Sequence, residues 1–545
     1  MFRFVSHRVA GFVFRHHRFW QFISGFPAIR DWINGEFINS IVNCTPPRPY
    51  PLSLWSPETT ASTYEPPNPR APAQVTDYVS WAGLVDRSYT GRHLPPYDSS
   101  AALPDVARLE AIFRRDTGPN GREAMIPSSN TSVLFCAFAQ WFTDSFLRTN
   151  PSDSRRNTSN HEIDLCQIYG LDAPTAKLLR SSGGGQLATR ITPRGELLPF
   201  LYQQVSLPAP APPAAQFAGL PYVATLDSIL QSLAPFALQP QRRDLTYATG
   251  LERGNSTVLY TSISTIFVRE HNRLCRLLAA RYPQWDDDRL FAIARNINIA
   301  MLLRIIIEEY INHLSGAKFK VFLERQFAEQ QKWYRTNRIC IEFDLLYRWH
   351  SLVPDAIEFE GRQLGGDDFR YNNALVEQYG PEALIRAASR QRAGRIGLFN
   401  TPHFLRKSDL LSVQFARMFK LAPFNAYRIH FGMEPYKSFE ELAGDPRTVQ
   451  ALKQLYASVD DVELVVGLLA EDRYDAAPLG DLMRTMVGVD AFSQALTNPL
   501  LSSNVYGEAA FSELGLSIMN DTRVFEDIVR RNAAPGTEVE ARFNN

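Results

Sequence analysis

The chain lacks an excess of charge of either sign, with 57 Lys and Arg residues against 57 Asp and Glu residues in 545 positions. Such a balance creates no field that would attract a polyanion, so we expect no nucleic-acid partner. Cysteine is also scarce. The five cysteines are scattered without CxxC spacing, which excludes a zinc ribbon and a disulfide framework. Their odd number favours free thiols in a reducing compartment.

Long hydrophobic runs and a clear targeting signal are missing as well. No run approaches the roughly 18 apolar residues of a spanning helix, and basic residues interrupt each apolar piece of the N-terminus, so no secretory signal is expected. Aromatic residues, by contrast, make up 12% of the chain. That content suits a large apolar cavity as well as a large core, and the length allows one large domain.

Residues 1–42 combine aromatic and basic residues in an amphipathic pattern. Phe, Trp, Ile and Val alternate with Arg3, Arg8, Arg15 and Arg18. Helices of this kind lie in the membrane interface with the apolar face down and the cations near the headgroups. The pattern alone leaves a second interpretation open, in which two short helices pack on the domain.

The most informative stretch is NRICIEFDLLYRWHSLVPD at residues 337–355. Its apolar residues are interleaved with few charges, which predicts a largely buried helix that Pro354 ends. On that helix Tyr347 and His350 would be i and i+3 neighbours. The residues alone allow a core helix with one satisfied histidine, or a haem iron ligated by His350 with Tyr347 standing over the substrate.

A second apolar helix is predicted at residues 130–150. It carries Gln140 and Asp144, which are i and i+4 and therefore share one face. Two polar groups on the buried side of an apolar helix need partners or a function. None of the ten histidines falls on this helix.

The central stretch resembles the cyclooxygenase (prostaglandin synthase) branch of the animal haem peroxidase superfamily. The resemblance rests on these strings: Asn337-Arg338, Glu342-Phe343, Leu346-Tyr347, Trp349-His350 and Pro354-Asp355. The run from Tyr347 to Ser351 is also similar to fungal fatty-acid dioxygenases. The match extends from about residue 15 to about residue 500 and implies a mainly α, cyclooxygenase-like haem peroxidase fold. N-terminal amphipathic membrane-binding helices would occupy residues 1–44 and the catalytic domain residues 45–545.

The resemblance also implies roles for four residues. His350 matches the proximal ligand of haem b, and Tyr347 matches the radical tyrosine of an enzyme that uses O2 as co-substrate. Gln140 matches a distal glutamine, but Asp144 stands where the family has the histidine that moves the peroxide proton. A buried aspartate with a raised pKa is in principle a general base. We therefore expect weak or absent peroxidase activity.

The same resemblance implies an apolar substrate channel. Its lining would be Tyr310, Ile311, Leu314, Phe343, Trp349, Val487 and Ser493. Ser493 falls on the serine that aspirin acetylates in cyclooxygenases, where it shapes the channel. No GxSxG elbow surrounds it, so it is not expected to be a hydrolase nucleophile.

Both residues that form the channel constriction in cyclooxygenases differ here. Ile41 stands in place of the arginine that pairs with the fatty-acid carboxylate, and Ala317 in place of a tyrosine. A carboxylate would lose its charge-assisted anchor at this point. The substrate would then be neutral, enter in reverse, or use another cation such as Arg30 or Arg48.

These observations predict a haem-dependent fatty-acid or lipid dioxygenase that uses a tyrosyl radical. Two alternatives stay open: a non-catalytic or repurposed haem- or lipid-binding membrane protein, and a haem enzyme that acts on a different substrate. The expected partners are a fatty acid or another apolar lipid, a membrane surface, and a second copy of the chain in a homodimer. The expected location is peripheral (monotopic) on the cytoplasmic side of a membrane.

Overall fold

The computed structural model describes residues 25–43, 86–98, 101–118, 123–150, 153, 155–204, 210–316, 320–334, 338–473 and 477–545. Within these ranges the chain is mainly helical, and its strands form four two-stranded antiparallel sheets. The expected mainly α fold is therefore confirmed. Most of the basic aromatic N-terminal pattern lies outside the described residues, as do Arg48 and Ala317.

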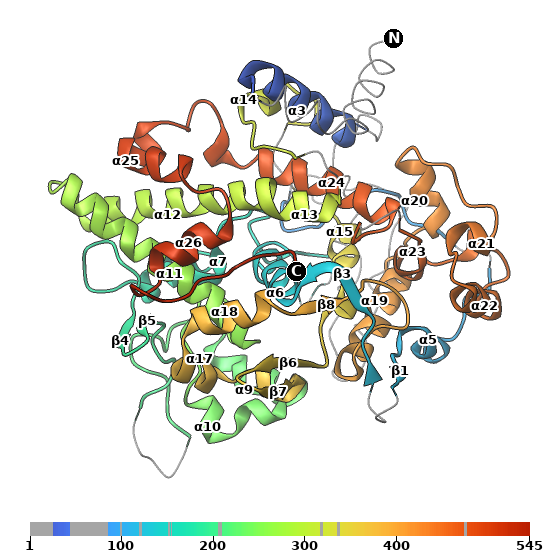
Figure 1. Cartoon of the computed structure of the whole chain (residues 1–545), viewed down its shortest axis with the longest axis horizontal. Coiled ribbons are helices and arrows are strands. Elements are labelled where there is room, and N and C mark those ends of the chain that lie inside the picture. Colours follow the sequence, from blue (N-terminus) through green and yellow to red (C-terminus); the bar gives the residue numbers. More distant parts are fainter. Residues whose placement is uncertain are drawn as a thin grey trace.

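Figure 1 shows the arrangement of these elements around a central core. The α-helices are α3 (Pro27–Val42), α5 (Val106–Phe113), α6 (Val133–Thr143), α7 (Cys166–Tyr169), α8 (Ala173–Leu179), α9 (Val223–Leu233), α10 (Pro240–Arg243), α11 (Val258–Arg281), α12 (Asp287–Ile305), α13 (Ile311–Ser315), α14 (Gln326–Glu329), α15 (Ile341–Leu346), α16 (Gly366–Phe369), α17 (Asn373–Tyr379), α18 (Pro381–Ser389), α19 (Arg406–Met418), α20 (Phe424–His430), α21 (Phe439–Leu442), α22 (Pro446–Leu455), α23 (Leu464–Ala470), α24 (Asp481–Leu496), α25 (Glu508–Asn520) and α26 (Phe525–Asn532). The strands are β1 (Asp116–Thr117), β2 (Glu123–Ala124), β3 (Pro127–Ser132), β4 (Arg190–Thr192), β5 (Gly195–Leu197), β6 (Ala356–Phe359), β7 (Arg362–Gly365) and β8 (Arg392–Gly394).

The two longest helices, α11 and α12, pack against each other in the core. A π-helical turn (Ile306–Tyr310) joins α12 to α13, and Gly316 ends the run in the left-handed conformation. The continuous segment Asp287–Ser315 is long and apolar enough to cross a membrane, but 78% of its apolar window is buried inside the protein. It is therefore a core helix. The sequence estimate of apolar runs missed its length because Arg304 and Glu308 interrupt the pattern.

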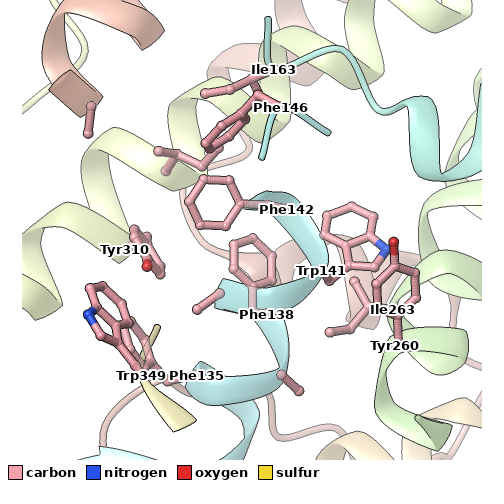
Figure 2. Packing of buried hydrophobic residues seen from close by; sticks show 14 of the residues in the cluster. Phe135, Phe138, Trp141, Phe142, Phe146, Ile163, Tyr260, Ile263, Tyr310 and Trp349 are labelled. Atoms are coloured by element: carbon pink, nitrogen blue, oxygen red, sulfur yellow. The ribbon is translucent and has the colours of Figure 1, made fainter. Parts of the chain in front are cut away.

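Helix α6 carries the aromatic centre of the core. Ser132 caps its first turn by accepting a hydrogen bond from the Phe135 backbone N–H. The Phe135 ring stacks on Tyr310 at 4.9 Å, and the Trp141 ring stacks on Phe267 at 4.7 Å. Figure 2 shows the α6 rings between Tyr310 and Trp349 on one side and Tyr260 on the other. The helix is shorter than predicted, because residues 127–132 form strand β3 and Asp144 is already the C-cap.

The prediction of one long helix over residues 337–355 is wrong. Helix α15 covers only Ile341–Leu346, Tyr347 is its C-cap, and a separate 3-10 turn covers His350–Leu352. The segment before α15 is extended because Gly91 pairs with the backbone of Ile339 and Ile341. Tyr347 and His350 are thus not neighbours on a helical face. Both still border the same cavity, which is described below.

Helix α3 packs against α24. The contact is close: a side chain at Gly488 would meet Ile41 Cγ2 at 2.9 Å. Two turns earlier on the same helix, Asn34 donates a hydrogen bond to the Phe322 carbonyl at 2.9 Å. The only arginine that the prediction offered as a carboxylate anchor within this helix, Arg30, is hydrogen-bonded to Asp31 at 2.6 Å. Its charge is therefore already neutralised locally.

Candidate functional site

One cavity of about 470 Å³ brings together the residues that the sequence singled out. Gln140 and Asp144 border it from the C-terminal end of α6. Tyr347, Trp349 and His350 border it from the turn after α15. Two segments two hundred residues apart in the sequence therefore enclose a space of the size that ordinary cofactor and ligand pockets have.

A buried carboxylate fixes the orientation of the His350 ring. His350 Nδ1 lies 2.6 Å from Asp409 Oδ1, and Asp409 is 1% exposed on α19. The second oxygen of Asp409 accepts a hydrogen bond from the Thr401 hydroxyl at 2.7 Å. Because the carboxylate accepts the Nδ1 proton, the other ring nitrogen, Nε2, is left as the metal-binding atom, and its basicity is increased.

Two aromatic side chains contact the ring of Tyr347. Its ring stacks on Trp349 at 4.5 Å and meets the edge of Phe343 at 5.0 Å. Burial raises the pKa of the Tyr347 phenol well above its usual value, and the neighbouring Tyr310 phenol offsets this only in part. The two phenols interact, because a hydrogen bond with Tyr310 lowers the pKa of Tyr347 while that with Tyr347 raises the pKa of Tyr310. The Tyr347 phenol is therefore neutral.

The residues predicted to line a channel are all buried and lie on elements that adjoin Tyr347. Tyr310 belongs to the π-helical turn, and Ile311 and Leu314 belong to α13. Val487 and Ser493 belong to α24, which packs against both α13 and α15. The Ser493 hydroxyl donates to the Val489 carbonyl at 2.7 Å, an ordinary contact within a helix. Their role in a channel stays a prediction.

The two residues on α6 have different environments, although both border the cavity. The Gln140 side chain is exposed and donates to the Ser256 hydroxyl at 3.4 Å, so the prediction that it faces the buried side of the helix is wrong. Asp144 is 5% exposed and forms an ion pair with Arg253 at 3.4 Å. Burial raises the pKa of Asp144, while Arg253 and Arg148 act in the opposite direction.

Sequence reasoning missed two residues of this site. Asp409 lies 59 positions after His350, and Arg253 lies 109 positions after Asp144. No local motif joins either pair, so only the fold shows that they meet. Asp409 and Arg253 are charged groups that each contact a residue the sequence did identify, His350 and Asp144.

The cavity suits a haem. His350 would supply the proximal ligand through its free ring nitrogen, and Arg253, Arg370 and Lys407 at the cavity wall would supply cations for the carboxylates of the macrocycle. Lys407 makes no ion pair within the described part of the chain. An imidazole hydrogen-bonded to a carboxylate, with Gln140 and Asp144 at the same cavity, is a set of polar groups typical of a haem oxidoreductase.

Comparison with known proteins agrees with this class. The family model for animal haem peroxidase matches residues 145–532. Prostaglandin G/H synthase 1 of Mus musculus is 32% identical over 471 residues, covering 83% of this chain and 72% of the relative. Prostaglandin G/H synthase 2 of Equus caballus is 30% identical over 462 residues, covering 82% of this chain and 71% of the relative.

Two solved structures share the fold. Peroxidase A from Dictyostelium discoideum has a TM-score of 0.65 at 20% identity and covers 84% of this chain and 95% of its own. The fatty acid alpha-dioxygenase of Oryza sativa has a TM-score of 0.65 at 16% identity and covers 92% of this chain and 90% of its own. The chain therefore belongs to the animal haem peroxidase family, in its cyclooxygenase-like branch. Enzymes of this family are haem oxidoreductases, and the oxygenases among them use O2.

The contact between Asp409 and His350 leads to a first prediction. Asp409→Asn keeps the size of the side chain but removes its charge, so less electron density reaches the iron through His350. We expect the reduction potential of the iron to rise and haem affinity to fall roughly ten- to a hundredfold. Spectroelectrochemical titration and haem-transfer kinetics measure both. Asp344→Asn is the matched control, because Asp344 borders the same cavity but pairs with Arg348; an equal effect there would contradict the role of Asp409.

Proposed function

We propose that the protein is a haem-dependent fatty-acid dioxygenase in which Tyr347 carries the radical. The observation that supports this most is the single cavity shared by His350 and Tyr347. The names of the relatives point to the same substrate class, because prostaglandin G/H synthases and a fatty acid alpha-dioxygenase are among them. Haem supplies the oxidising equivalent that converts the Tyr347 phenol to a phenoxyl radical.

The chemistry of the acyl chain then needs only Tyr347 and O2. The phenoxyl oxygen takes a hydrogen atom from the chain, which restores the phenol and leaves a carbon radical. O2 adds to that carbon, and the resulting peroxyl radical takes a hydrogen atom back from the phenol. The product is a lipid hydroperoxide, and the tyrosyl radical is regenerated. The aromatic rings on both sides of Tyr347 keep water from the radical.

The main test is oxygen uptake by the full-length, haem-loaded protein with saturated and polyunsaturated fatty acids and a trace of peroxide as primer. Uptake with formation of a hydroperoxide supports the proposal. A protein that binds haem but takes up no oxygen with any fatty acid would instead be the non-catalytic haem-binding protein. The ion pair between Asp144 and Arg253 is the feature that favours this second candidate, because it engages the residue at the distal position.

Asp144 sets the expected peroxidase behaviour. As a general base it must be ionised, and burial raises its pKa. The protonated, inactive form therefore persists to higher pH than for an ordinary aspartate, and peroxidase activity should rise as the pH passes this raised pKa. Arg253 forms an ion pair with Asp144, and this pairing makes Asp144 a weaker base.

Asp144→His is expected to raise peroxidase turnover by roughly ten- to a hundredfold, since a positioned imidazole is the more effective proton carrier near neutral pH. Guaiacol oxidation over a range of pH measures the change. Asp144→Asn is the control, because it cannot accept the proton and should lower the rate. If the histidine variant gains nothing while its haem spectrum is intact, Gln140 and Arg253 do not complete a working distal site.

We also propose that α3 rests on a membrane surface. Phe26, Ile29 and Trp32 are 50%, 45% and 59% exposed, and their spacing places them on one face of the helix. Such a face lies in the interface of a bilayer. In a vesicle flotation assay, the double variant Trp32→Ser and Ile29→Ser should move the protein from the vesicle fraction to the soluble fraction. Substitutions on the buried face of α3 would also disturb its packing, so they are not a suitable control. Unchanged flotation would exclude α3 as the anchor.

A further inference from the structure

A second cavity, of about 730 Å³, is bordered by arginines; Leu352 lines both cavities, but Tyr347 and His350 do not border this one. Arg392 comes from β8, Arg395 from the turn that follows it, and Arg473 from the segment after α23. Arg447, in the first turn of α22, is the fourth. The proposed oxygenase reaction uses none of these residues, so the cavity needs a separate explanation.

The arginines of this cavity differ in whether their guanidinium groups have hydrogen-bond or ion-pair partners. Arg447 donates two hydrogen bonds to Asp116, at 2.5 and 2.8 Å. Among the described residues, by contrast, no side-chain hydrogen bond or ion pair is formed by Arg392, Arg395 or Arg473. Arg392 and Arg395 are exposed and Arg473 is half-buried. Their guanidinium groups are therefore accessible to a ligand that enters the cavity.

The carboxylates that border the cavity are hydrogen-bonded or paired with neighbouring groups, although Asp445 and Asp472 also act electrostatically on Arg395 and Arg473. Glu471 pairs with Arg428 at 2.5 Å. Asp445 caps α22 and accepts the Thr448 hydroxyl at 2.7 Å, and Asp472 accepts the Gly444 backbone N–H at 2.6 Å. After these pairs are set aside, three arginines face two carboxylates that are already hydrogen-bonded. The cavity therefore keeps a positive balance.

The guanidinium group of Arg473 lies beside Gly397 and within electrostatic range of Arg395. Gly397 has φ of +152°, and a side chain there would meet Arg473 Nη2 at 2.6 Å. The guanidinium group therefore lies directly against Gly397. Desolvation, with the charge of Arg395 as the next cause, lowers the pKa of Arg473 to about 10, so the group stays charged at neutral pH beside a like charge. Two cations held together in this way repel each other until an anion lies between them.

We propose that this cavity binds the phosphoryl group of a phosphate ester, held between Arg395 and Arg473. Two planar guanidinium forks come from different elements and carry two positive charges. A phosphate monoester has three terminal oxygens and a charge of about −1.5 to −2, which matches two cations better than the single charge of a carboxylate. The hydroxyls of Ser128 and Ser129 border the same space. The volume exceeds that of inorganic phosphate, which leaves room for the organic part of the ester.

The test is isothermal titration of the full-length, haem-loaded protein with inorganic phosphate, with acetate at equal ionic strength as the comparison. We expect saturable binding of phosphate that weakens roughly ten- to a hundredfold in Arg473→Gln and in Arg395→Gln, because each loses charge-assisted hydrogen bonds. Arg447→Gln is the matched control, since its group is already held by Asp116; it should change affinity less than threefold or so. Arg473→Lys keeps the charge but not the fork and should recover only part of the affinity.

Two further arms identify the source of the phosphoryl group. Competition by soluble glycerol phosphate indicates a small metabolite, and binding to vesicles with phosphatidic acid but not to phosphatidylcholine vesicles indicates a lipid headgroup. Either result supports the site. No saturable heat with phosphate, equal binding of acetate, or unchanged affinity in Arg473→Gln would overturn it. Unchanged haem spectra in the variants establish that they are folded, and oxygen uptake is a separate measurement that does not bear on this outcome.

Discussion

Tyr347→Phe is expected to reduce fatty-acid oxygen uptake to the background rate while the haem spectrum stays unchanged. The phenyl ring keeps the contacts with Trp349 and Phe343, at 4.5 and 5.0 Å in the native chain, so packing is preserved. What disappears is the O–H group, which is the only part of the side chain that gives and takes a hydrogen atom. An oxygen electrode with a peroxide primer measures the rate, and electron paramagnetic resonance of the primed protein measures the radical.

Tyr310→Phe is the matched control for this change. Tyr310 is also fully buried, and its phenol is close enough to influence the pKa of Tyr347. It does not border the cavity that contains His350. Loss of the Tyr310 hydroxyl should therefore alter the rate without abolishing it. If oxygen uptake survives in Tyr347→Phe and disappears in Tyr310→Phe, the radical resides on Tyr310 and the proposed assignment is wrong.

The long core helices α11 and α12 each carry a local signal in the sequence. The segments that became α11 and α12 have many apolar residues over more than four turns, and polar caps at their starts: Thr257 and Asp286 accept hydrogen bonds from the first turns. Signals of this length and kind do not depend on the rest of the fold. The same holds for α6, whose apolar run and Ser132 cap lie within a few residues.

The stretch at residues 337–355 was misjudged for the opposite reason. Its apolar content is high, but the backbone of Ile339 and Ile341 is paired with Gly91, more than two hundred residues earlier. That pairing is invisible in the sequence and limits α15 to six residues. Burial could be predicted from composition, whereas helix length was decided by a distant strand-like contact.

The same distinction between local and long-range signals applies to the residues of the site. Tyr347, His350, Gln140 and Asp144 were found because their spacing resembles a family pattern, and the structure gathers all four at one cavity. Asp409 and Arg253 were not found, because each acts through a single long-range contact. Asp144 borders the cavity, whereas Asp409 is hydrogen-bonded to His350 and does not line it. With haem bound, Asp409 would increase electron donation by His350, which would favour cleavage of a peroxide bond and offset in part an aspartate at the distal position.

His350→Ala is expected to remove the haem absorption band and all oxidase activity. His350 is the only histidine among the described residues that border the cavity, and its Nδ1 contact with Asp409 at 2.6 Å holds the ring in place. The truncated side chain leaves Asp409 without its imidazole partner but does not break α15 or α19. Absorption spectra of the protein after haem reconstitution measure the loss.

His403→Ala is the control for that substitution, because His403 is exposed and lies on a neighbouring 3-10 turn. It should bind haem as the native chain does. Added imidazole should restore part of the absorption band in His350→Ala, since the free ligand can occupy the space above Asp409 and regain its hydrogen bond. A band that survives in His350→Ala without added imidazole would place the iron ligand on another residue. In that case Tyr347 would not stand beside the cofactor, and the radical mechanism would lose its physical basis.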